Sequence, residues 1–114
     1  MEGDADEQLT DAWLACRLGR AISHDEHLRI SFVLLQRFGR EEGARRIGDG
    51  TRRNCAALGA SDRYDDKLTQ RWTDALADAI EGGEDSDAEA FLSAHPRFRD
   101  SGLFGPPAWR STPA

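Results

Sequence analysis

The chain has 114 residues, a formal net charge of -6 and 32% charged residues. This length suits one domain with one modest core, and the acidic balance argues against binding to nucleic acid through general electrostatics. No segment approaches the ~20 apolar residues of a membrane-spanning helix, and the acidic start lacks the basic and apolar parts of a signal peptide. We therefore expect a cytoplasmic protein with neither a membrane nor a nucleic-acid partner.

Apolar residues recur at helical spacing along most of the chain, and no run has the period-two alternation of a strand. This pattern predicts an all-α fold: a single small domain of four to five helices around one core, spanning residues 9–104. Residues 1–8 are expected to be disordered or frayed. A first amphipathic helix is expected over 9–20, and a central, more apolar helix over 24–38, which Gly39 ends.

The second half of the chain shows weaker helical signals. The pattern over 40–58 contains glycines that predict a break or kink near 48–50. A helix buried along one stripe is expected around Trp72, ending at the glycines 82–83.

The last predicted helix is short. Ser86 and Glu89 have the S-x-x-E spacing of a capping box, and the helix must stop before Pro96. Residues 105–114 then form a Pro-containing, irregular tail. Its Trp109 needs cover, which docking back over the domain or burial in a partner chain would provide; loose order is the other alternative.

The two cysteines, Cys16 and Cys55, lie in helical stretches without C-x-x-C spacing. This favours buried, reduced thiols in the cytoplasm, with a disulfide as the alternative.

Two of the three histidines stand at the start of the central helix. Ser23 and Glu26 form a capping box there, and His24 and His27 lie at i and i+3, on one face. Because the positive end of a helix dipole disfavours imidazolium, both rings should titrate low. A neutral imidazole pair can accept protons, bind a metal or orient a ligand; two incidental surface residues are the alternative.

The sequence Tyr64-Asp65-Asp66 stands at the entrance of the Trp72 helix. If the two helices lie side by side with their N-termini at one end, an aspartate faces the histidines. That arrangement suits an acid-base pair, or, as a lesser variant, a divalent metal held by His24, His27 and Asp65. The alternative is that the aspartates only cap their helix.

Three further residues are candidates for contact with a ligand. Arg53, beside Arg52 and after the glycines, suits the binding of a substrate anion, although such charge runs are commonly exposed surface. Tyr64 and Trp72 suit pocket walls, or ordinary core.

The order of these motifs resembles a family of small, uncharacterised bacterial helical proteins. The resemblance covers about residues 20–104 and rests on His24-x-x-His27-Leu28, Gly50-x-x-Arg53, Tyr64-x-x-x-Leu68-Thr69-x-x-Trp72, and Phe91-Leu92 with His95-Pro96. It implies an architecture and candidate positions, without a substrate. Where that family usually has histidine and threonine, this chain has Asp65 and Lys67, so a three-histidine site is missing. Either the aspartate replaces the third histidine as ligand or base, or the activity has changed.

These observations lead to one principal hypothesis, a small cytoplasmic bacterial enzyme that uses acid-base chemistry on a small organic substrate, in specialised metabolism. His27 would accept the proton, His24 would assist, Asp65 would orient an imidazole and Tyr64 would donate, while Arg53 and Trp72 would bind substrate. No cofactor is expected, and no nucleophile motif is present. A noncatalytic module for a ligand or a protein partner is the alternative, and a homodimer joined through the tail is a further one.

Overall fold

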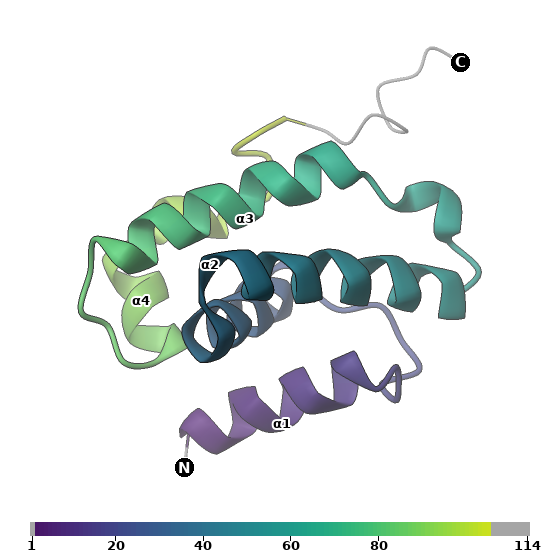
Figure 1. The fold of residues 1–114 in the computed structure, drawn as a ribbon, viewed down its shortest axis with the longest axis horizontal. Helices are drawn as coiled ribbons and strands as arrows, with labels where there is room; N and C mark the ends of the chain where they lie inside the picture. Colours follow the sequence, from purple (N-terminus) through teal and green to yellow (C-terminus); the bar gives the residue numbers. More distant parts are fainter. Residues whose placement is uncertain (1, 106–114) are drawn as a thin grey trace.

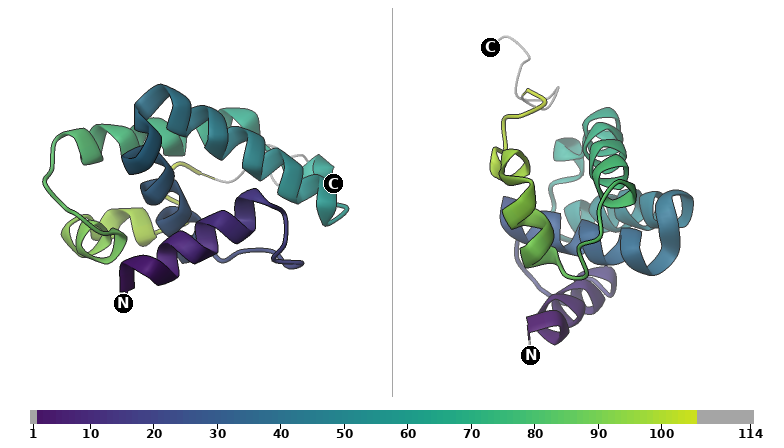
Figure 2. Two further views of the ribbon diagram at one scale, coloured as in Figure 1. Left: turned by 60° about the horizontal axis from the view of Figure 1, so that its bottom comes forward. Right: turned by 90° about the vertical axis from the view of Figure 1, so that its left-hand side faces the viewer.

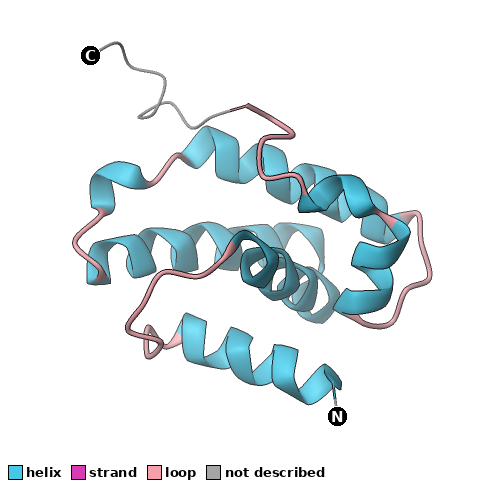
Figure 3. Cartoon of the chain, turned by 180° about the vertical axis from the view of Figure 1, so that it is seen from behind, coloured by secondary structure: helices cyan, strands magenta, loops and turns pink. Residues whose placement is uncertain are grey.

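The computed structural model describes residues 2–105 and contains four α-helices and two short 3-10 helices (Figure 1). These are α1 (Glu2–Leu14), α2 (His24–Ala57), η1 (Ser61–Arg63), α3 (Asp66–Glu81), α4 (Ala88–Ala94) and η2 (Pro96–Arg99). None of the described residues is in a strand (Figure 3), so the predicted all-α fold is confirmed. Residues 106–114, including Trp109, lie outside the described part.

Helix α2 forms the centre of the fold. It packs against α1 on one side and α3 on the other, and it also contacts α4 and both 3-10 helices (Figure 1). The first half of α2 is the most apolar part of the chain and provides much of the core, as its sequence predicts. The buried apolar residues are Trp13, Leu28, Ile30, Phe32, Leu34, Leu35, Ile47, Leu76, Ala77, Ala88, Phe91, Leu92 and Phe98.

The break in α2 lies at Gly39, where φ is 82° and ψ is 179°. Only glycine adopts this conformation readily, so the helix changes direction there (Figure 2). The expected end of the central helix, over 24–38, at Gly39 is confirmed. The expected break near 48–50 is wrong, because the helix continues through those glycines to Ala57.

Helix α1 differs from its predicted range at both ends. It begins at Glu2 rather than at Leu9, so residues expected to be frayed are helical. A tertiary ion pair explains the early start: Asp6 lies 3.5 Å from Arg29 of α2, and the two side chains are largely buried. The helix ends at Leu14 because Cys16 has a positive φ and the Asn54 side chain donates to the Trp13 carbonyl oxygen at 2.8 Å.

Helix α3 runs antiparallel to the second half of α2. Arg40, at the start of that half, pairs with Asp78 and Glu81 near the end of α3, and Gly48 lies beside Tyr64, just before α3 begins. This arrangement brings the middle of α3, and not its N-terminus, to the start of α2.

Aspartates cap both of the later helices. The Asp65 carboxylate accepts from the Leu68 N–H at 3.0 Å, and Asp87 accepts from the Ala90 N–H at 2.8 Å. The predicted Ser86 cap of α4 is therefore wrong by one residue. Glu89, its expected partner, instead accepts from Arg29 and Arg99.

Cys16 and Cys55 are partly buried free thiols. Within the described residues, no helix has the length and the apolar character that crossing a bilayer requires.

A pair of glycine substitutions tests the packing of α1 on α2. A Cβ at Gly50 would overlap the Trp13 ring, whereas a Cβ at Gly48 would meet only the Tyr64 Oη, at 3.7 Å. We expect Gly50→Ala to lower the free energy of unfolding by about 1–3 kcal/mol through overpacking. We expect Gly48→Ala to be neutral or to raise it by up to ~1 kcal/mol, because alanine favours helix. Urea denaturation of both variants measures this, and equal effects would contradict the packing described.

Candidate functional site

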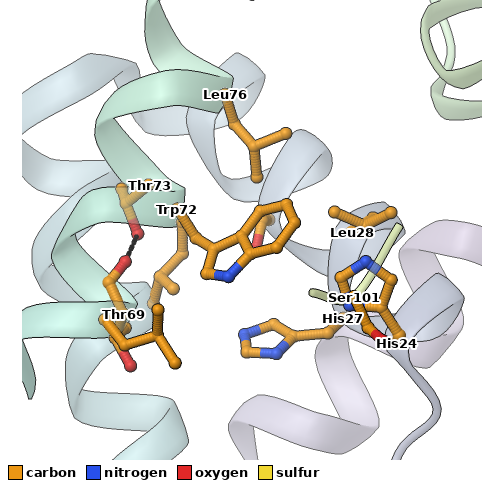
Figure 4. Close-up of a pocket in the computed structure, with 11 residues that line it drawn as sticks. His24, His27, Leu28, Thr69, Trp72, Thr73, Leu76 and Ser101 are labelled. Carbon is orange, nitrogen blue, oxygen red and sulfur yellow. Dashed lines mark hydrogen bonds between the residues drawn. The ribbon is translucent and has the colours of Figure 1, made fainter. Parts of the chain in front are cut away.

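A pocket of about 220 Å³ lies between α2 and α3, and we call it the α2–α3 pocket (Figure 4). Its lining residues are His24, His27, Leu28, Ser31, Ile47, Leu68, Thr69, Trp72, Thr73, Leu76 and Ser101. The histidines come from the first half of α2, and Trp72 comes from α3 on the opposite side. The site is therefore a hollow between two helices that combines five apolar lining residues with six polar ones.

His24 is held in place by contacts to two other parts of the chain. Its Nε2–H donates to the Phe98 carbonyl oxygen at 2.7 Å, and its ring packs edge-on against Trp72 with the ring centroids 5.0 Å apart. Because a carbonyl oxygen only accepts, the hydrogen bond places a proton on Nε2. In the neutral ring Nδ1 is then the proton acceptor.

His27 lies one turn further along α2, with its ring 6.2 Å from that of Trp13. Burial lowers the pKa of His27 to about 4, and the neighbouring His24 contributes a smaller lowering. His27 is therefore neutral at pH 7. Its ring forms no side-chain hydrogen bond within the described part of the chain, so it faces the pocket with one N–H donor and one acceptor nitrogen available.

Ser31 adds a second polar group without a partner. Only 3% of its surface is exposed, and its hydroxyl makes no hydrogen bond to any described residue. Thr73, on the α3 side, is equally buried, but its hydroxyl donates to the Thr69 carbonyl oxygen at 2.8 Å. Since buried polar groups are nearly always paired, the Ser31 hydroxyl stands out as a group that a bound molecule would satisfy.

The structure brings together three of the six residues that the sequence singled out: His24, His27 and Trp72 line the same pocket. Asp65 is not one of the described residues that line it. Its carboxylate caps α3, as the simpler alternative expected. The expected meeting of two helix N-termini is not found, because the start of α2 faces the middle of α3.

Tyr64 and Arg53 lie elsewhere. The Tyr64 hydroxyl donates to Asp66 Oδ1 at 2.7 Å and lines a second, more polar groove that also contains Arg52. Burial, with a contribution from Asp66, raises the pKa of Tyr64 to about 12, so the phenol keeps its proton. Arg53 is exposed on an arginine-rich part of α2.

The described residues contain no group of three or more His, Cys, Asp or Glu side chains that could hold a metal ion. The variant with His24, His27 and Asp65 as metal ligands therefore has no cluster to support it.

The sequence analysis did not identify two parts of the site, the Ser31 hydroxyl and the Phe98 carbonyl oxygen. Only Ser31 could have been found from the residue pattern. His24, His27, Leu28 and Ser31 follow i, i+3, i+4 and i+7 spacing, so Ser31 is a polar residue on the histidine face of an apolar helix. The Phe98 carbonyl oxygen that orients His24 is a backbone atom 74 residues away, and no side chain marks it.

The chain matches no protein-family model, no curated protein and no solved structure in the comparisons made. The interpretation of the site therefore rests on its own geometry.

The low pKa of His27 predicts how stability depends on pH. The unfolded chain binds a proton at this residue below its ordinary pKa of 6.5, whereas the folded protein does so only near 4. The stability that the neutral ring provides is thus complete above pH 6.5 and is lost as the pH falls toward 4, by up to roughly 3 kcal/mol.

Urea denaturation between pH 7.5 and pH 4, on the wild type and on His27→Gln, measures this loss. We expect the variant to lose less stability over this interval, because the carboxylates contribute equally to both proteins. Parallel curves would show that His27 is not buried as described.

Proposed function

We propose that this protein binds a small organic molecule in the α2–α3 pocket. The observation that supports this most directly is the pair of polar groups on one face of α2. The His27 ring and the Ser31 hydroxyl line the pocket and hydrogen bond to none of the described side chains. Leaving such groups unpaired costs stability, and a ligand with a matching polar group would offset that cost.

Acid-base catalysis is a second candidate, and the geometry of His24 favours it. The Phe98 carbonyl gives this ring the orienting partner that the sequence hypothesis sought in Asp65, leaving Nδ1 as a proton acceptor. His27 supports catalysis less well, because a pKa of about 4 makes it a weak base at neutral pH. Binding without catalysis is therefore our first proposal, and a bacterial enzyme of specialised metabolism is our second.

The free thiols and the acidic composition are consistent with a cytoplasmic location. The family resemblance and the small pocket together support a bacterial protein that handles small metabolites.

Titration with a panel of charged and uncharged single-ring compounds, followed by amide NMR, tests the binding function. We expect saturable shifts concentrated at the lining segments 24–31, 68–76, 47 and 101, with dissociation constants roughly in the micromolar to millimolar range. Trp72→Ala should weaken binding at least about tenfold through the lost ring contact. Arg71→Ala, which changes the exposed neighbour of Trp72, is the matched control and should bind like the wild type.

The binding function is contradicted if no compound in the panel gives saturable shifts there, or if Trp72→Ala binds as tightly as Arg71→Ala. The same samples separate the two candidate functions. NMR signals of a new product, which disappear when His24 or His27 is replaced, indicate catalysis. Saturable shifts of the protein with a chemically unchanged test compound indicate binding alone.

A further inference from the structure

The chemistry of the α2–α3 pocket also restricts the class of molecule that it binds, provided that the proposed binding function is correct. The pocket walls carry no carboxylate, ammonium or guanidinium group. None of the 11 described lining residues is an aspartate, glutamate, lysine or arginine, and the only titratable groups on the walls are the two imidazoles. Burying a charged ligand without an opposite charge is costly, so these walls favour an uncharged molecule.

The size of the pocket suits a ligand built on a single ring. A cavity of about 150 Å³ is large enough for benzene, and this pocket has about 220 Å³. The remaining space leaves room for a small substituent on that ring.

The walls favour a flat, aromatic ring. Leu28, Ile47 and Leu76 provide apolar surface, while Trp72 and the imidazole of His24 provide ring edges and faces (Figure 4). Aromatic rings gain further stabilisation from edge-on or offset contacts with such neighbours.

The polar groups select the substituent. His27 and Ser31 are four residues apart on one helix face, so their Cβ atoms are about 6 Å apart and one small group can contact both side chains. The neutral imidazole offers an acceptor nitrogen, and the serine hydroxyl offers a donor. A single hydroxyl group satisfies both, because it donates one hydrogen bond and accepts another.

We propose that the pocket binds an uncharged single-ring aromatic alcohol of the phenol class, whose hydroxyl donates to His27 and accepts from Ser31. The ring lies against Trp72, between the apolar side chains of α2 and α3.

Calorimetric or NMR titration at pH 7 with phenol, toluene and benzoate tests this proposal. The three compounds share the ring and differ in the substituent: a hydroxyl, a methyl and a carboxylate. We expect phenol to bind at least about tenfold more tightly than toluene, corresponding to the hydrogen bonds to a buried site, and benzoate to bind more weakly than either.

Ser31→Ala provides the matched variant, since it removes the hydroxyl and leaves a small side chain. It should reduce the preference for phenol over toluene severalfold while toluene binds as before, and that unchanged toluene affinity shows that the pocket is still folded. His27→Leu should also reduce the preference.

Each outcome has a distinct meaning. The phenol assignment is overturned if toluene or benzoate binds as tightly as phenol, or if Ser31→Ala keeps the full preference. It is also overturned if phenol fails to bind while another panel compound occupies the pocket. In each of these outcomes a compound still binds in the pocket, so the proposed binding function stands. If neither these three compounds nor the panel bind, the proposed function itself fails.

Discussion

The break at Gly39 is the constraint on which the rest of the structure depends. Without it, the 34 residues of α2 would form a straight rod of about 50 Å, longer than the 44 Å longest extent of the molecule. With it, the first half of α2 carries the histidines and the second half holds α3 alongside. Because α3 runs antiparallel to that second half, its middle reaches back to the start of α2, and Trp72 meets His24.

The pocket thus combines local and long-range parts. Helical periodicity alone places His24, His27 and Ser31 on one face of α2. Trp72 arrives through helix packing, and the segment after α4 arrives through the hydrogen bond between His24 and the Phe98 carbonyl oxygen. The same segment places Ser101 at the pocket and Phe104 against Trp72, with their ring centroids 4.8 Å apart. His24 therefore acts as the point where three parts of the chain meet.

The sequence predicts those features of the fold that depend only on residues close together in the chain. The Ser23–Glu26 capping box, the ends at Gly39 and Gly82 and the shared face of the two histidines depend on neighbours within a few residues. Interactions between distant residues determine the rest. The Asp6–Arg29 pair extends α1, Trp13 packs on Gly50 where a break was expected, and the capping of α3 takes Asp65 away from a role at the imidazoles.

The central claim is that the start of α2 and the middle of α3 enclose one pocket. Nuclear Overhauser effects in solution between the imidazole protons of His24 and the indole protons of Trp72 test it most directly, since the two ring centroids lie 5.0 Å apart. The structure predicts clear cross-peaks between these rings. Their absence, in a protein whose amide signals show α2 and α3 fully formed, would contradict the pocket and the functions proposed for it.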